Sequence, residues 1–255
     1  MLTNNQSYSK RDVLKFLSML KVDTRFISLY DFKIYINNLR FSKFSRKKEE
    51  TFTNKFPNIE IFRSSVFQKI AIKSSKSLSH SIKVKDNILI FNKNKKDILS
   101  NIIMESYLRK YGITLIESDL NSYDEFLKLK DKYEILKFLK DNNINGVVSS
   151  LTLDKEVKHI LSNILSGERL KSYPQNINFK NESFKIKILY PFIKGVDYKS
   201  IDTVCEILKI NGEEDKDNQN STDQDKLSLE FINFLDELIP HYKENIMKSA
   251  EFLKK

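Results

Sequence analysis

The stretch 113–150, "ITLIESDLNSYDEFLKLKDKYEILKFLKDNNINGVVSS", contains a complete strand–helix–strand unit. A short apolar run opens it, an amphipathic segment follows, and a second apolar run closes it. Between the last two, "NING" has the Asn-Gly chemistry of a turn. Parallel strands need crossovers of this kind, which are almost always right-handed. The stretch therefore predicts two parallel neighbours in one sheet.

The same alternation extends over residues 83–210. Short apolar runs predict strands near 84–91, 113–117, 146–150 and 184–191, and helical spacing of apolar residues predicts a helix after each of them. We therefore expect an α/β fold, a small layered domain with a mainly parallel sheet. A basic helical or mixed N-terminal region precedes it, and a C-terminal amphipathic helix follows it.

Composition divides the chain into four parts. The basic region spans 1–80 and the α/β domain spans 81–210. Residues 211–226 contain no apolar side chain and predict a flexible polar linker. The last part, 227–255, predicts an amphipathic helix or a helical hairpin, because Pro240 interrupts its helical pattern.

Within the basic region the local patterns are weaker. Apolar spacing predicts a helix over 10–21 and a second over 28–40, in the outline of a helix-turn-helix. "IEIF" (59–62) and "VFQKIAIK" (66–73) have the composition of strands, and "SSKSLSHS" (74–81) that of a loop.

Charge is distributed unevenly along the chain. Residues 1–80 hold 16 Lys/Arg against 6 Asp/Glu, whereas residues 81–255 hold 28 of each. The abundance of Lys, Asn and Ile is typical of an AT-rich genome, but such a bias acts along the full length. The concentration of positive charge in the first third therefore predicts a surface for a polyanion.

Basic residues alternate with Phe in "RFSKFSRKKEETFTNKF", residues 40–56. Lys and Arg neutralise phosphates, and exposed Phe rings stack on unpaired bases. The predicted nucleic-acid contacts are Arg40, Lys43, Arg46, Lys47, Lys48, Lys55 and Arg63. Two alternatives stay open: a solvated basic face whose Phe residues point inward, and a face for an anionic membrane surface.

Polar residues follow the predicted strands, where ligands of open α/β sheets bind. The candidate ligand site consists of Glu117, Ser118, Asp119 and Ser149. The alternative is that Ser118 or Asp119 only caps the next helix.

Several kinds of site are absent from the sequence. GxGxxG, GxxxxGK[ST] and GxSxG motifs do not occur, and the three His residues are far apart. Cys205 is the only cysteine, on the apolar face of its helix, which excludes an internal disulfide and a Cys-rich metal site. We expect no cofactor, no metal and no catalytic constellation. No apolar run is long enough to cross a membrane, and we expect a cytoplasmic location.

Three functions follow from these patterns. The main hypothesis is a non-catalytic cytoplasmic binding protein, whose basic region contacts nucleic acid or another polyanion and whose α/β domain binds a partner or small ligand. The first alternative is an interaction component that docks a protein partner through 227–255. The second is an enzyme that uses carboxylates at the carboxyl ends of its strands.

Overall fold

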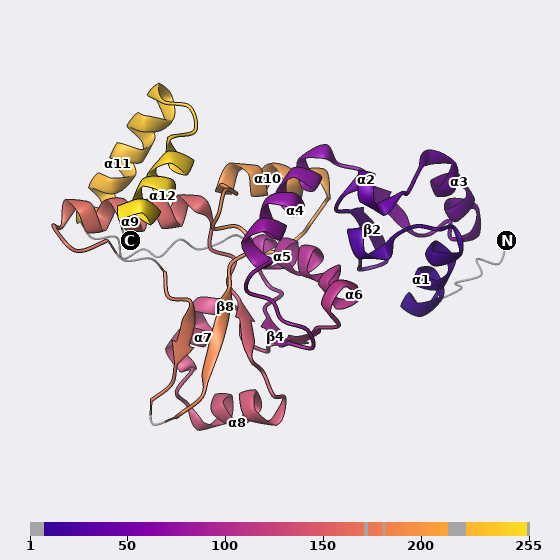
Figure 1. Cartoon of the computed structure of the whole chain (residues 1–255), viewed down its shortest axis with the longest axis horizontal. Helices are drawn as coiled ribbons and strands as arrows, with labels where there is room; N and C mark the ends of the chain where they lie inside the picture. The colour runs from indigo at the N-terminus through magenta and orange to yellow at the C-terminus, as the bar shows by residue number, and fades with distance from the viewer. Residues whose placement is uncertain (1–7, 171–172, 181, 214–222, 254–255) are drawn as a thin grey trace.

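The structure is a computed structural model that describes residues 8–170, 173–180, 182–213 and 223–253. Two sheets organise these residues. A three-stranded sheet with its helices lies at one end of the molecule, and a pair of C-terminal helices lies at the other (Figure 1). The five-stranded sheet lies between them. In the described residues no helix is both long enough and apolar enough to span a bilayer.

The first sheet has the order β1-β2-β3. Its elements are α1 (Lys10–Met19), the 3-10 turn η1 (Thr24–Phe26), β1 (Ile27–Tyr30), β2 (Lys33–Ile36), α2 (Leu39–Ser42), α3 (Arg46–Lys55) and β3 (Glu60–Phe62). We call residues 8–62 the basic module. β1 and β2 pair antiparallel, and β3 pairs parallel to β2.

The predicted helix over 28–40 is wrong, and with it the helix-turn-helix outline. The segment forms the β1–β2 hairpin, with Asp31 and Phe32 at φ 48° and 53° in its two-residue turn. Two positive φ values are what a type I′ hairpin turn requires. The strands are rich in Ile and Tyr, which favour a pleated surface. Leu29, Phe32 and Ile36 matched helical spacing only because the segment is apolar on both faces.

The strand predicted over 66–73 is also wrong, since this segment lies within α4 (Ser65–Leu78). Ser64 caps the helix by accepting a hydrogen bond from the Phe67 amide at 3.2 Å. The buried residues of α4 recur at helical spacing: Phe67, Ile70, Ala71, Ser74 and Leu78. Most of the predicted loop over 74–81 therefore also belongs to this helix.

The second sheet confirms the predicted α/β fold. Its elements are β4 (Asn87–Ile90), α5 (Lys95–Glu105), α6 (Tyr107–Tyr111), β5 (Thr114–Glu117), α7 (Tyr123–Leu129), α8 (Tyr133–Asp141), β6 (Gly146–Val148), α9 (Leu153–Leu165), β7 (Asn176–Asn178), β8 (Lys185–Leu189) and α10 (Tyr198–Ile207). The strand order is β5-β4-β6-β8-β7. β5, β4, β6 and β8 are parallel, and β7 is an antiparallel edge strand.

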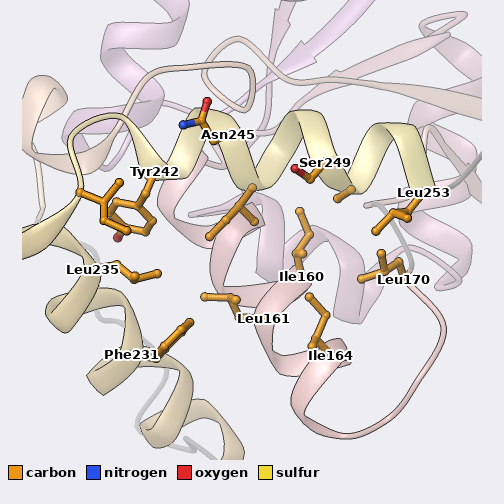
Figure 2. A pocket seen from close by; sticks show the side chains of 13 residues that line it. Ile160, Leu161, Ile164, Leu170, Phe231, Leu235, Tyr242, Asn245, Ser249 and Leu253 are labelled. Carbon is orange, nitrogen blue, oxygen red and sulfur yellow. The ribbon is translucent and has the colours of Figure 1, made fainter.

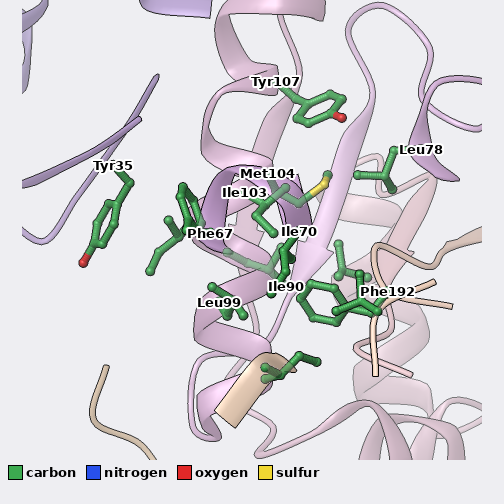
Figure 3. Packing of buried hydrophobic residues seen from close by; sticks show 14 of the residues in the cluster. Tyr35, Phe67, Ile70, Leu78, Ile90, Leu99, Ile103, Met104, Tyr107 and Phe192 are labelled. Carbon is green, nitrogen blue, oxygen red and sulfur yellow. The ribbon is translucent and has the colours of Figure 1, made fainter. Parts of the chain in front are cut away.

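Successive residues of β4 point to opposite faces of this sheet and build two cores. Ile88 and Ile90 pack with residues of α4, α5 and α10, whereas Leu89 packs with residues of α7 and α8. Figure 3 shows that the first of these cores also receives Tyr35, from the basic module. Helix α5 contacts both β1 and α10, so it joins the two sheets.

A buried carboxylate fixes the contact between the two sheets. Glu105, 3% exposed, accepts hydrogen bonds from both terminal nitrogens of Arg109 at 2.7 Å and from the Leu29 amide at 2.9 Å. Lys10 adds an ion pair at 2.8 Å, and Arg109 also donates to the carbonyl of Ile27 at 2.6 Å. Burial raises the pKa of Glu105, but Arg109 and Lys10 outweigh burial and hold the pKa below its usual value.

The C-terminal part forms a helical hairpin, α11 (Asp223–Leu238) and α12 (Tyr242–Leu253), and both helices pack on α9. This confirms the predicted C-terminal amphipathic helix. Of the predicted linker, residues 214–222 lie outside the described residues, and 223–226 belong to the first turn of α11. Residues 211–213 lie against residues 93–95. The Glu213 amide donates a hydrogen bond to the Lys93 carbonyl at 2.9 Å.

We predict that Glu105→Gln destabilises the chain by about 3 kcal/mol at pH 7, because it leaves Arg109 and Lys10 without their buried anion. The lowered pKa of Glu105 means that this stabilisation exists at neutral pH and is lost as the pH falls below about 4. Urea unfolding at pH 7 and at a pH below about 4 measures the loss of stability and its dependence on pH. The exposed Glu50→Gln is the matched control, expected within about 0.5 kcal/mol. An equal loss for Glu105→Gln at both pH values would contradict the ionic origin.

Candidate functional site at the carboxyl ends of the parallel strands

The four parallel strands bring their carboxyl ends to one edge of the second sheet. Asn92, Lys93 and Asn94 follow β4, Ser118 follows β5, and Ser149 and Ser150 follow β6. Because β4 is the neighbour of both β5 and β6, its loop lies at the centre of this edge. Ligands of open parallel sheets bind at such an edge.

The predicted set Glu117, Ser118, Asp119 and Ser149 is split by this topology. β4 lies between β5 and β6, which puts Glu117 and Ser149 two strand spacings apart, roughly 10 Å. Glu117 accepts a hydrogen bond from Asn92 at 2.6 Å. The Ser118 hydroxyl accepts from the Leu120 amide at 3.1 Å, and Asp119 is exposed. Glu117 and Ser149 thus lie on opposite sides of the loop that follows β4.

The cap of α7 differs from the one that the sequence suggested. Ser122, rather than Ser118 or Asp119, accepts a hydrogen bond from the Glu125 amide at 3.2 Å. The Glu125 carboxylate in turn accepts from the Asn121 amide at 2.8 Å. This reciprocal pattern has the S-x-x-E spacing of a capping box, which is visible in "SYDE".

A buried aspartate that sequence reasoning did not single out lies at the centre of the edge. Asp97, 3% exposed, is in the first turn of α5. Its carboxylate accepts hydrogen bonds from the Ser150 hydroxyl and from the Asn94 side chain, each at 2.6 Å. Burial raises the pKa of Asp97, and the two hydrogen bonds oppose that rise. The sequence signal was the spacing N-x-x-D directly after a strand, where Asn94 caps α5 and holds Asp97.

Ser149 lies beside this carboxylate in a small hollow of about 30 Å³, room for about one water molecule. Its hydroxyl is buried and has no hydrogen-bond partner among the described residues. Lys96 and Lys155 also line the hollow, and Lys96 is only 5% exposed. Asp124 lines the hollow as well, so it combines two carboxylates, one of them the buried Asp97, with an unused hydroxyl and two cations, groups that can take part in acid–base chemistry.

The loop 93–95 is held from outside by the segment 211–213. A Cβ on Gly212 would lie 2.8 Å from the Lys95 amide nitrogen and 3.0 Å from the Asn94 carbonyl carbon. Only glycine permits this approach. Cys205 lies on the same side, where its thiol is 3.8 Å from the Lys95 carbonyl oxygen. Burial raises the pKa of Cys205 to about 12, so the thiol is neither a nucleophile nor a ready metal ligand at neutral pH.

The predicted nucleic-acid contacts fall into two groups. Lys48 donates to the carbonyls of Lys21 and Lys43, at 2.9 and 2.8 Å, and Arg63 is paired with Glu49 and donates to the Phe44 carbonyl. These two cations therefore hold the basic module together. The other five are exposed: Arg40, Lys43, Arg46, Lys47 and Lys55. Phe44 and Phe52 are fully buried, which decides for a core role and against stacking on bases.

The C-terminal hairpin contributes an apolar hollow of about 440 Å³ on α9. Figure 2 shows Ile160, Leu161 and Ile164 of α9 facing Phe231 and Leu235 of α11 and Leu253 of α12. Its lining is mostly apolar, with Tyr242, Asn245 and Ser249 as the polar residues. The docking of a protein partner through 227–255 stays a prediction.

Comparison with known proteins finds solved structures of the same fold. The chain is similar to the U34-tRNA thiolase NcsA from Methanococcus maripaludis, solved with its 4Fe–4S cluster. The TM-score is 0.53 at 12% identity, and the match covers 78% of this chain and 83% of the thiolase. No family model matches the chain, and no curated protein matches its sequence. At this identity the likeness shows the fold.

This likeness corrects the main functional hypothesis. A non-catalytic binding protein is the wrong reading, because the fold shared over most of the chain is that of an enzyme, and the enzyme alternative fits better. The cluster of the thiolase does not fit this chain, however. Iron–sulfur clusters are held by several Cys thiolates, and the sequence has one cysteine, which is buried. Within the described ranges no group of three or more His, Cys, Asp or Glu is placed to hold a metal ion.

We predict that Ser150→Ala raises the pKa of Asp97 further. The Ser150 hydroxyl donates at 2.6 Å to the carboxylate and stabilises its charged form, so its removal leaves burial less opposed. Carbon-detected NMR titration of the Asp97 carboxyl group measures the change. Ser166→Ala, at the exposed end of α9, should leave the Asp97 titration where it is in the unaltered chain. A pKa that stays constant in Ser150→Ala would show that this contact does not control the carboxylate.

Proposed function

We propose that the chain is an enzyme that modifies tRNA, with its reaction centre at Asp97, Ser149 and Ser150. The observation that carries the proposal is the buried Asp97 carboxylate beside the unused Ser149 hydroxyl, at the carboxyl edge of a sheet whose fold is shared with a tRNA thiolase. Catalytic groups of enzymes are commonly buried and perturbed in pKa in this way. A cytoplasmic location, where tRNA is modified and a lone thiol stays reduced, is part of the proposal.

The chemistry available at this edge is proton transfer next to bound negative charge. Asp97, with its pKa raised by burial, holds or accepts a proton closer to neutral pH than an exposed aspartate does. Lys96 and Lys155 supply fixed positive charge in the hollow. Asn94 and Ser150 orient the Asp97 carboxylate, and the Ser149 hydroxyl is a free donor and acceptor for a substrate. None of these roles requires an iron–sulfur cluster.

The basic module supplies the contact with RNA in this proposal. We assign phosphate contacts to its exposed cations Arg40, Lys43, Arg46, Lys47 and Lys55, and the asymmetry of charge along the chain supports this role. In this proposal the basic module binds the RNA and the α/β domain acts on it.

We predict that Asp97→Asn abolishes the modification, with a loss of roughly 100- to 10,000-fold in rate. The measurement compares the nucleosides of tRNA, by mass spectrometry, from source cells that carry the unaltered chain, no chain, or the variant. We expect one modified nucleoside to be missing from the second and third. Asp141→Asn, an exposed residue at the end of α8, is the matched control and should restore that nucleoside. Identical nucleoside profiles with and without the chain would overturn the proposal.

We predict that the protein purified without oxygen contains far less iron than the four atoms per chain that one 4Fe–4S cluster holds. The physical reason is the lack of thiolate ligands, since burial keeps the one thiol protonated. Elemental analysis of the purified chain measures the iron. Stoichiometric iron that survives Cys205→Ser would contradict the prediction and point to ligands from other residues.

A further inference from the structure

Another hollow, of about 290 Å³, lies where the basic module meets the α/β domain. It is distinct from the hollow at Asp97, because Asp97 is at the start of α5 and this hollow is at its end. Phe26 and Phe41 line it from the basic module, Ile72 and Lys76 from α4, and Tyr107 and Lys110 from α6. Its volume is at the lower limit of small-molecule sites, room for one planar group with its substituent.

Aromatic and apolar surface is left open to solvent in this hollow. The rings of Phe26 and Phe41 lie 5.2 Å apart between centroids at 33°, and Phe41 is 52% exposed. Ile72, across the hollow, is 42% exposed. Arg40 lies 5.8 Å from the Phe41 centroid, so cationic charge lies beside the exposed ring. A planar aromatic ligand would cover the ring and keep this charge at its edge.

A lysine without an anion lies deeper in the same hollow. Lys110 has its ammonium 5.0 Å from the Phe26 centroid and 4.7 Å from that of Tyr107. Burial lowers its pKa, and among the described residues no carboxylate forms an ion pair with it. The nearby Asp23 and Glu105 are held by Arg25 and Arg109. Lys76 adds a second cation, and no Asp or Glu lines the hollow.

We propose that this hollow binds one nucleotide, with its base against Phe41 and Phe26 and its phosphate at Lys110 and Lys76. A stacking face and an unpaired cation side by side are what an unpaired nucleotide requires. The inference rests on the proposed function for the source of the ligand, an unpaired nucleotide of the RNA substrate. A free mononucleotide offers the same chemistry, and the experiment separates the two sources.

The test measures binding of a single-stranded RNA pentamer, the matching RNA duplex and free UMP or AMP to the full chain, by fluorescence anisotropy and calorimetry. We expect the pentamer to bind more tightly than the duplex. Phe41→Ala should weaken pentamer binding roughly five- to hundredfold, the loss of one stacked base. Lys110→Gln should weaken it and lower the log–log salt slope by roughly 0.7, the loss of one phosphate contact on a single strand.

Matched control variants distinguish binding at this hollow from non-specific binding to the surface. Tyr133→Ala removes an aromatic ring that is 74% exposed on α8, and Lys128→Gln removes an exposed cation of α7. Both should bind the pentamer as the unaltered chain does. Because Phe41 is exposed, its removal should leave the thermal unfolding midpoint almost unchanged, which shows that lost binding is not lost folding.

Each outcome decides between the sources or against the site. Binding of UMP or AMP that falls in both Phe41→Ala and Lys110→Gln, without pentamer binding, identifies a free nucleotide as the ligand. Pentamer and mononucleotide binding that neither variant changes overturns the inference. The proposed function is tested separately by Asp97→Asn: an unchanged nucleoside profile with a Phe41-dependent pentamer leaves this site standing and removes the enzyme assignment.

Discussion

Helix α5 is enclosed by protein along nearly its whole length, and the surrounding elements supply hydrogen bonds to its buried polar side chains. Nine of its eleven residues are buried, among them Asp97, Asn101 and Glu105. Burying a polar group without a partner is costly, and each of these three has hydrogen-bond partners, although the Asn101 side-chain oxygen has none among the described residues. Asn101 donates to the Phe91 carbonyl and to Asn92, Asp97 is held by Asn94 and Ser150, and Glu105 by Arg109. One helix thereby carries the strand-end carboxylate at its start and the junction between the sheets at its end.

The chain shares its fold with an iron–sulfur thiolase but lacks the cysteines for a cluster. The same fold can therefore hold different chemical groups at its functional edge. A parallel sheet concentrates strand ends, loops and helix starts at one edge whatever residues occupy them. In this chain that edge holds lysines, serines, asparagines and one buried aspartate, which suit proton transfer and the binding of negative charge. The electrostatic arrangement extends beyond the edge, since the exposed cations of the basic module and those around Phe41 all favour a polyanion.

The regular part of the fold could be predicted from sequence because its four parallel strands and the helical segments between them differ in period. The basic module could not, because Leu29, Phe32 and Ile36 satisfy a helical period by chance in a hairpin that is apolar on both faces. Period alone does not distinguish short segments of that kind. The ligand site predicted from the sequence lies at the same edge of the sheet as Asp97 but does not include Asp97, and its role stays a prediction. The N-x-x-D spacing in "NKNKKD" indicates a helix cap, but the burial of Asp97 depends on tertiary packing around α5, which the spacing does not show.

The contact of Gly212 with residues 93–95 limits where an expression fragment of this chain can end. The residues after α10 pack against the start of α5, where the backbones of Glu213 and Lys93 are hydrogen-bonded. An expression fragment that stops at the end of α10 would expose that loop and loosen the turn that presents Asp97. A fragment that extends through Glu213 retains this packing contact. The smallest fragment that keeps the start of α5 in place is thus longer than the alternating strands and helices suggest, by the few residues that follow α10.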